Sequence, residues 1–492
     1  MKQIKKAYLS IILAILIPGL SSCGDYLYVE PIGQSTIASF FYDIEGLTAA
    51  GIGMHAEMVG FHDSDYTKYA ELMGDMLNLN PVYAGEGDVF LTNYRMLPSY
   101  DASYPYNIWK AGYGAITNAN NILYYGPDLR ERYPKNLKEI DKNLGYAHFA
   151  RALIHFDLCN CYARPYNYTP DASHIGIPVV DYIPSFESVI KRSSVKSVYD
   201  LIVSDLKEAI ELLDGVNGDI YYVTQDAAKA LLARIYLYME EWDKAAELSS
   251  ELMQKYELTP RKDYVDMFRN AKVVPGSEMI FRFNQFSKTS SMRSFYDPTA
   301  TQDALPCPVI TTYYEADDVR KSLLTYIPES VEDSVHIGKE YSAVCKYLPY
   351  KSITDTEKRV PDFPLLRVSE QYLIHAEAVL KGSNADIEAA AGDIKALEGR
   401  ARGLAPGKIT LLYSNKEDMM NLIERERVKE LCYEGHRFFD LARWKKDVVR
   451  SSYSNAEVKL LKYEDHHFIL PIPRMEMQAN EYMVQNDDYP RL

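Results

Sequence analysis

Four charged residues near the C-terminus are spaced so that they could interact on a helix. Each is three residues from the next: Glu434, Arg437, Asp440 and Arg443. On a helix this spacing places residues on neighbouring turns, where a carboxylate and a guanidinium can pair. Such carboxylates could also do acid–base chemistry, but charges paired along a helix are far more often a solvated or structural face. We therefore expect a structural role for them.

The surrounding run predicts one long helix from Asn421 to Trp444. Its apolar residues recur at helical intervals and would form one buried stripe: Val428, Leu431, Cys432, Gly435, Phe438, Phe439 and Ala442. A glycine inside a helix costs roughly 1 kcal/mol relative to alanine. We therefore expect another segment to approach the helix closely at Gly435.

The rest of the chain offers no catalytic motif. It has no nucleophile elbow, P-loop, dinucleotide fingerprint or zinc-binding helix. A glycosidase needs two carboxylates roughly 5–10 Å apart, and among 69 acidic residues no pair is singled out by spacing. We therefore expect a binding protein that is not an enzyme and needs no cofactor.

Cysteine and histidine spacing gives no sign of a transition-metal site or a disulfide. Cys159 and Cys161 are two apart on a predicted helix and would point in different directions. His466 and His467 are adjacent in a predicted strand and would face opposite sides. We expect buried free thiols and surface histidines. The sequence leaves open whether a structural calcium is bound.

Composition indicates an acidic, folded globular protein. The 492 residues are 47% hydrophobic and 25% charged, with a formal net charge of −15. Phosphate neutralisation by Lys and Arg supplies most of the affinity for nucleic acids, so this charge argues against such a partner. The chain also has 41 tyrosines, whose rings suit wet contact surfaces as well as cores.

The N-terminus reads as a bacterial lipoprotein signal spanning residues 1–22. Lys2, Lys5 and Lys6 precede a short apolar stretch, and Leu20-Ser-Ser-Cys23 matches a lipobox. Cleavage before Cys23 would let that residue carry the lipid anchor, and several acyl chains give stable membrane attachment. The alternative is an ordinary secretory signal beside a chance cysteine. No later stretch is apolar for long enough to span a bilayer.

Helix pairs of tetratricopeptide type are predicted at two places. One runs from Gln225 to Tyr256 with a short turn at 240–243, and the other from Leu366 to Arg402. Stacked pairs bury a continuous core and hold loops outside it. Strands are predicted at 277–283 and 339–347. The fold class is therefore mainly α: a tetratricopeptide-like helical-pair scaffold with long irregular loops and a few short β-strands.

Two aromatic, turn-rich loops are the candidate ligand site, at residues 75–106 and 284–302. Aromatic rings there could stack on sugar faces, while amides and charged groups hydrogen-bond hydroxyls. Peptides would use similar groups, and each ring could equally pack its own loop. The candidates are Asn78, Tyr83, Tyr94, Arg95, Phe295, Tyr296 and Asp297. Trp109 shares a helical face with Tyr113, Ile116 and Asn120, so we assign it to packing.

Several ordered motifs resemble the SusD/RagB family of outer-membrane nutrient-binding lipoproteins. The run from Glu424 to Trp444 resembles its Glu-Arg, Glu-Leu, Glu-Gly-x-Arg, Asp-Leu-x-Arg-Trp signature. Further matches lie in the Trp109 helix, in residues 143–165, where Ala163-Arg164 replaces a glycine-containing pair, in residues 366–402, and in the closing segment 468–486. They extend from Cys23 to Asn486, which is nearly the whole chain.

This resemblance implies a fold and a role. It implies a SusD-like α-α superhelix, with an N-terminal region at 23–256 and a C-terminal region at 257–492 packed as one unit. It also implies a protein on the outer membrane, facing the exterior, that delivers oligosaccharides to a SusC-like TonB-dependent β-barrel transporter. Peptides are the alternative ligand, and a secreted hydrolase or a structural repeat adaptor are the less favoured functions.

Overall fold

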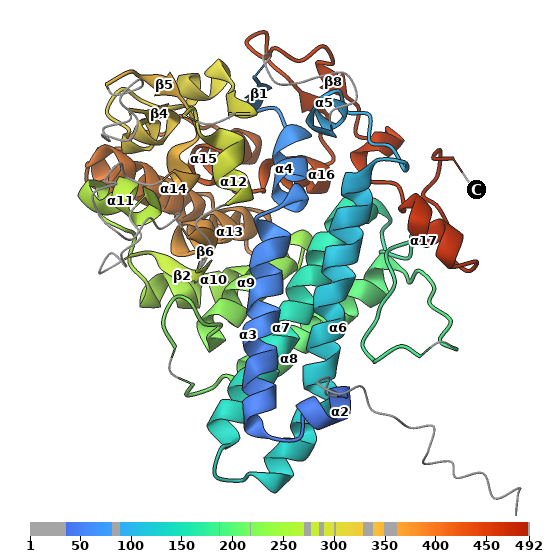
Figure 1. The fold of residues 1–492 in the computed structure, drawn as a ribbon. Helices are drawn as coiled ribbons and strands as arrows, with labels where there is room; N and C mark the ends of the chain where they lie inside the picture. The colour runs from blue at the N-terminus through green and yellow to red at the C-terminus, as the bar shows by residue number, and fades with distance from the viewer. Residues whose placement is uncertain are drawn as a thin grey trace, which may run out of the picture.

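Antiparallel helices stacked side by side make up most of the molecule. The computed structural model describes residues 36–80, 89–185, 187–216, 218–269, 277–284, 290–299, 302–327, 338–348 and 362–490. Its longer helices are α3 (Ile44–His62), α6 (Ser103–Arg132), α7 (Leu137–Tyr162), α8 (Val195–Leu212), α9 (Gln225–Tyr238), α10 (Trp242–Lys255), α13 (Val368–Lys381), α14 (Ile387–Arg402) and α15 (Lys416–Leu431). Each packs against its neighbours in this order, from α3 beside α6 to α13 beside α14 and α15 (Figure 1).

Several short helices and two-stranded sheets cover the end of this stack that carries β1 and β8, whereas α2 lies at the other end (Figure 1). The short helices are α2 (Ile37–Phe40), α4 (Asp65–Leu72), α5 (Val89–Tyr94), α11 (Tyr264–Arg269), α12 (Ser291–Tyr296), α16 (Arg437–Arg443) and α17 (Arg474–Ala479). The antiparallel strand pairs of the described residues are β1 (Leu77–Leu79) with β3 (Ala304–Pro306), β2 (Met279–Phe283) with β6 (Phe363–Arg367), β4 (Thr325–Tyr326) with β5 (Tyr341–Ser342), and β7 (Val448–Val449) with β8 (Leu460–Leu461).

The predicted helix pairs are confirmed, and local sequence explains their ends. Helices α9 and α10 form the first pair, and α13 and α14 the second. The side chain of Ser194 accepts a hydrogen bond from the Ser197 amide at the start of α8, which satisfies a backbone donor that the helix leaves open. Helix α14 ends at Gly403, whose φ of +69° is left-handed. The strand predicted at 339–347 is limited to Tyr341–Ser342, and Cys345–Tyr347 form a 3₁₀ turn.

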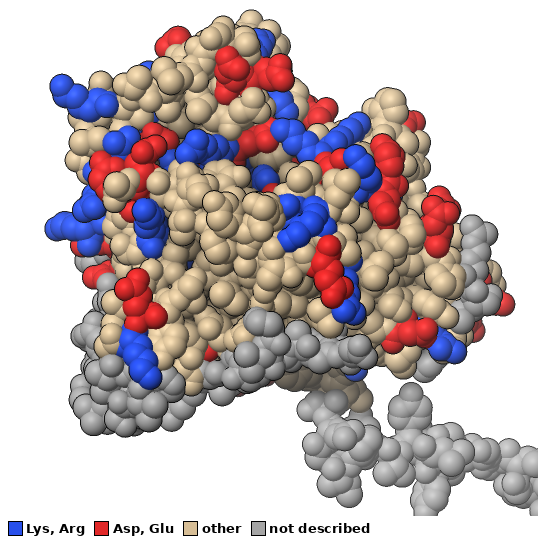
Figure 2. Space-filling view, turned by 90° about the horizontal axis from the view of Figure 1, so that it is seen from above, with Lys and Arg blue, Asp and Glu red and all other residues tan. Residues whose placement is uncertain are grey.

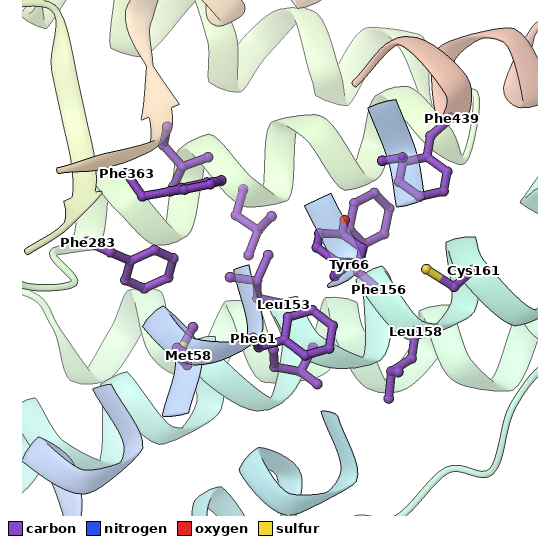
Figure 3. Close-up of a cluster of buried hydrophobic side chains, with 14 of the residues drawn as sticks. Met58, Phe61, Tyr66, Leu153, Phe156, Leu158, Cys161, Phe283, Phe363 and Phe439 are labelled. Atoms are coloured by element: carbon purple, nitrogen blue, oxygen red, sulfur yellow. The ribbon is translucent and has the colours of Figure 1, made fainter. Parts of the chain in front are cut away.

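The hydrophobic core joins segments that are far apart in sequence. Figure 3 shows side chains of α3 and α4 meeting those of α7, together with Phe283, Phe363 and Phe439. Within this core the Asp157 carboxylate accepts hydrogen bonds from Tyr66 Oη at 2.7 Å and contacts His62 Nε2 at 2.9 Å. Trp109 is buried beside Tyr162, so its predicted packing role is confirmed. The five cysteines after residue 23 are buried free thiols, as predicted.

The predicted single helix over residues 421–444 is wrong. Helix α15 ends at Leu431 and α16 begins at Arg437. Between them, Tyr433 and Gly435 have φ values of +67° and +82°. These left-handed conformations cannot continue a right-handed helix, and only glycine adopts them without strain. Gly435 is therefore required by its backbone angle, while the nearest atom to a Cβ placed there would be 3.9 Å away.

Most charges of this run are buried, among them Glu430, Asp440 and Arg443, so they form a structural cluster and no solvated face. Glu430 is fully buried among Arg320, Arg367 and Arg400, with nitrogen–oxygen distances of 2.9 to 3.0 Å. Of the predicted pairs, Asp440 and Arg443 do contact each other at 2.8 Å. Glu434 and Arg437 instead pair with partners far away in sequence.

Candidate functional site

The two aromatic candidates on α12 are core residues in this structure. Phe295 and Tyr296 have no exposed surface. The Tyr296 ring stacks on Tyr347 with centroids 5.8 Å apart, and the Phe295 ring packs against Phe90 at 5.4 Å. Ligand contact by these rings is therefore contradicted for this conformation, because α12 turns its apolar side inward to pack. Their role is the loop-packing alternative.

Asp297 also serves its own loop. It is buried, and its Oδ1 atom accepts hydrogen bonds from the amide and hydroxyl of Thr299 at 2.9 and 2.6 Å. Its Oδ2 atom pairs with Arg293 Nε at 3.2 Å. These bonds hold the turn that follows α12. Tyr83 and Cys23 lie outside the described residues, and their predicted roles stay predictions.

Asn78 and Tyr94 are buried, and together they fix a loop from the far end of the chain. Tyr94 Oη donates to Asn455 Oδ1 at 2.7 Å and contacts Asn78 Oδ1 at 3.3 Å. Asn78 Nδ2 donates to the Tyr453 carbonyl at 3.2 Å. A further hydrogen bond runs from Asn455 Nδ2 to the Leu79 carbonyl at 2.7 Å. Both candidates are therefore positioning residues for residues 453–457.

Arg450 anchors the base of this loop. It is buried, and it donates to the carbonyls of Leu72, Gly74 and Tyr94, with its guanidinium over the Tyr94 ring at 4.4 Å. Burial lowers the pKa of Arg450 to about 10, which leaves it charged at neutral pH. Burial also raises the pKa of Tyr94 above its ordinary value, so the phenol stays a neutral hydrogen-bond donor.

The fixed loop presents one aromatic ring and one ion pair to solvent. Tyr453 is 59% exposed, and Arg95 Nε pairs with Glu457 Oε2 at 3.1 Å on the surface. We call Tyr453, Arg95 and Glu457 the 453–457 face. Exposed Val449 and Leu460 of the adjacent β7–β8 hairpin add apolar surface. A planar ring beside charged hydrogen-bonding groups can stack on a sugar and bind its hydroxyls.

Figure 2 views the molecule from the end that carries β1, α5 and β8. Lys, Arg, Asp and Glu side chains form a band across this end and surround a hollow, beside a broad area with few charges. This end of the molecule thus offers charged side chains for polar recognition.

Sequence reasoning missed Tyr453 and Glu457. The sequence feature that could have pointed to them is the polar run Ser451-Ser-Tyr-Ser-Asn455, which is rich in turn-forming residues, as residues 75–106 are. The run lies more than 350 residues from Asn78 and Tyr94. Only the tertiary structure brings these segments together.

One cluster of metal-ligating side chains occurs within the described part of the chain. Asp465, His466 and His467 have ligand atoms within 4.8 Å of one another. The predicted strand at these histidines is wrong: residues 466–468 form a 3₁₀ turn, so both rings lie on the same side as Asp465. His467 Nδ1 lies 2.8 Å from Asp465 Oδ1. The same carboxylate oxygen accepts a hydrogen bond from the backbone N–H of His467 at 2.9 Å.

The fold is a helical-pair scaffold that carries the 453–457 face on a loop held by Asn78 and Tyr94. Residues 34–237 match the family described as "Starch-binding associating with outer membrane", and residues 313–489 match the SusD family. These two ranges cover most of the chain. The protein belongs to the SusD/RagB family, whose members are carbohydrate-binding and associated with the outer membrane.

Similar proteins extend over the same length. SusD-like protein P2 of Formosa agariphila is 22% identical, and the match covers 99% of each chain. A SusD superfamily protein from Bacteroides vulgatus has a solved structure with a TM-score of 0.76 and 24% identity, covering 91% of this chain and all of that one. A SusD-like carbohydrate binding protein from the same species gives a TM-score of 0.69 and 20% identity, covering 92% and 98%. These structures confirm the predicted fold.

Within the described residues, no helix is both long enough and apolar enough to cross a membrane.

Proposed function

We propose that this protein is an outer-membrane lipoprotein, anchored through Cys23, that captures oligosaccharides outside the cell. It passes them to a SusC-like TonB-dependent β-barrel transporter and catalyses no reaction itself. The carbohydrate-binding family supports the ligand class, and the lipobox Leu20-Ser-Ser-Cys23 supports the anchor.

The observation that carries the proposal is the exposed Tyr453 ring on a rigidly held loop. Asn78 holds the backbone of Tyr453, and a loop that is already ordered loses little conformational freedom when a sugar stacks on its exposed ring. Arg95 and Glu457, which pair on the surface where the same loop ends, add hydrogen-bonding groups that solvent reaches. Tyr83, from the segment that follows Asn78 along the chain, is proposed as a further contact.

Calorimetric titration of the mature protein tests this function. We expect binding to one class in a panel of oligosaccharides and no response to a panel of peptides. Tyr453→Ala should weaken binding at least about tenfold, because it removes a stacking surface worth about 1.4 kcal/mol or more. Tyr222→Ala is the matched control, since Tyr222 is 48% exposed at another place on the surface. Tight peptide binding without any glycan response would overturn the proposal in favour of peptide capture.

The delivery step has a separate test. Gentle detergent extraction followed by affinity purification of the full-length protein should bring down a β-barrel of the TonB-dependent class. Purification of this chain alone, under conditions that preserve other outer-membrane complexes, would contradict that partner.

A further inference from the structure

A second aromatic groove lies beside the long helices, away from the 453–457 face. It runs between α6, α7 and the segment 181–183, and its volume is about 680 Å³. The residues of its lining that matter here are Asn120, Tyr124, His148, Arg151, Asp181 and Tyr182. It adjoins α2, because Tyr125 stacks on Phe41, and α2 lies at the end of the helix stack opposite β8 (Figure 1).

We infer that this groove is a second carbohydrate-binding site, which holds a short uncharged oligosaccharide between Tyr124 and Tyr182. The inference rests on the proposed function, because it assumes that the protein binds sugars. It adds a separate site with its own residues and its own preference for neutral ligands.

The two tyrosines supply exposed ring surface to the lining of the groove. Tyr124 is 67% exposed and Tyr182 is 44% exposed. The Tyr124 ring packs edge-on against Tyr125 at 4.8 Å, and Tyr125 in turn stacks on Phe41 at 5.0 Å with the planes 9° apart. This chain of rings fixes the orientation of Tyr124. Rings that keep one face open to water offer the flat apolar surface that sugar C–H faces need.

The opposite wall is held in place by one buried amide. Asn120 Nδ2 donates to the carbonyls of Val180 and Tyr182 at 3.0 and 2.9 Å. Asn120 Oδ1 accepts from Arg151 Nη1 at 2.8 Å, and the same guanidinium nitrogen donates to the Asp181 carbonyl at 3.2 Å. The segment that carries Tyr182 is therefore tied to α6 and α7. A preformed wall avoids an ordering cost when ligand binds.

The floor of the groove is polar but electrically balanced. Arg151 makes a bidentate ion pair with Asp205, with nitrogen–oxygen distances of 2.7 and 2.8 Å. His148 Nδ1 lies 2.7 Å from the same carboxylate. Burial alone would raise the pKa of Asp205, but hydrogen bonds from Arg151 and His148 lower it below its ordinary value. Asp205 therefore stays ionised and neutralises Arg151.

This charge balance selects among sugars. Because Arg151 is neutralised, the exposed charge of the groove is the Asp181 carboxylate. A carboxylate accepts hydrogen bonds from sugar hydroxyls and repels anionic sugars such as uronates. His148 Nε2 is the ring nitrogen left for a second hydroxyl. The groove volume lies within the usual range of ligand clefts, roughly 300–1,000 Å³.

The experiment counts sugar sites on the mature full-length chain. The probes are maltohexaose, xylohexaose and laminarihexaose as neutral sugars and hexagalacturonate as the anionic one, measured by calorimetry and by ligand-observed NMR. We expect two sites for at least one neutral probe. Tyr124→Ala with Tyr182→Ala should remove the groove site and leave the site at the 453–457 face. Tyr453→Ala should remove the site at the 453–457 face and leave the groove site. The anionic probe should not bind the groove.

Two further variants separate stacking from folding. Tyr124→Phe with Tyr182→Phe keeps both rings and should retain the groove site within about threefold in affinity. Tyr222→Ala should leave both sites intact. Both alanine positions are exposed, and unchanged thermal unfolding would show that those variants fold.

The failures are distinguishable. If a sugar binds, and its stoichiometry and affinity are unchanged in the Tyr124→Ala with Tyr182→Ala protein, the groove inference is overturned while the proposed function stands. If that variant binds sugars as the wild type does but no longer co-purifies with the transporter, the groove inference is also overturned. The groove would then be a contact surface for the transporter. If no probe in an extended glycan panel binds the wild type, the proposed function and the groove inference both fall.

Discussion

The Gly435 amide donates a hydrogen bond of 2.6 Å to the Glu71 carboxylate, across 364 residues of sequence. Glu71 is buried at the end of α4, and Gly435 lies in the left-handed turn between α15 and α16. The contact ties the most information-rich stretch of the C-terminal half to the helices of the N-terminal half.

Glu71→Gln should stabilise the protein at alkaline pH. Burial raises the pKa of Glu71 from 4.5 to about 7, although the Gly435 hydrogen bond opposes this shift. The folded state therefore binds the proton more tightly than the unfolded state, so this residue's contribution is full below pH 4.5 and is lost as pH rises through 7. Glutamine keeps an acceptor for the amide and carries no charge.

We expect the Glu71→Gln protein to be more stable than wild type by about 3 kcal/mol at pH 8 and nearly equal to it at pH 4.5. Urea unfolding at both pH values measures the difference. A difference that is the same at both pH values would show that Glu71 is not the titrating group.

Gly435→Ala should destabilise the fold through its backbone. The φ of +82° strains any residue with a Cβ, and we expect a loss of about 1–2 kcal/mol. The control is Gly392→Ala, because Gly392 lies exposed inside α14 with open space around its Cβ position. That change should stabilise by about 0.5–1 kcal/mol. Equal effects of the two substitutions in chemical unfolding would refute the conformational argument.

Glu430→Gln should be among the most damaging single changes. It removes the charge that faces Arg320, Arg367 and Arg400 and leaves buried guanidiniums under-compensated, at a cost of about 3 kcal/mol or more. Asp128→Asn, which breaks a surface pair with Arg132, should change stability by less than about 1 kcal/mol.

The same cluster predicts acid sensitivity. Burial would raise the pKa of Glu430, but the three arginines hold it well below its ordinary value of 4.5. Its stabilising contribution is therefore present above pH 4.5 and is lost as pH falls below that value. Wild-type unfolding free energy should fall on acidification below pH 4.5, and the Glu430→Gln protein should show a shallower fall. Parallel curves would contradict this.

Tyr296→Ala should lower the stability of the protein and should have no direct effect on ligand binding. The side chain is fully buried against Tyr347, and truncating a buried aromatic costs about 3–5 kcal/mol. Thermal unfolding monitored by circular dichroism checks this directly. A stable Tyr296→Ala protein with weakened glycan binding would restore the ligand role that the sequence suggested.

Cys23→Ala should release the protein from the membrane. Without a thiol at residue 23 the lipid anchor predicted from the lipobox cannot form. Fractionation of cells that express each form, with membranes washed in high salt, measures the change. Continued membrane association of the variant would contradict the lipobox interpretation.

The sequence by itself determined the local elements and the family. Apolar periodicity located the pairs α9–α10 and α13–α14, and Ser194 marked the start of α8, because these signals lie within one or two helical turns. The ordered motifs identified the SusD/RagB family, which the comparisons confirm. Such features are readable because local backbone preferences and side-chain spacing act over a few residues.

Only the tertiary structure decided which residues are exposed and which charges meet. Periodicity could not show that Gly435 breaks the run from 421 to 444, because apolar spacing continues across the turn. Nor could it show that Glu430 is buried, since its arginine partners are 30 to 110 residues away. Phe295 and Tyr296 occur in a loop-like composition yet fill the core, while Tyr453, Tyr124 and Tyr182 remain exposed. Exposure depends on what packs across from a residue, and that is fixed by contacts distant in sequence.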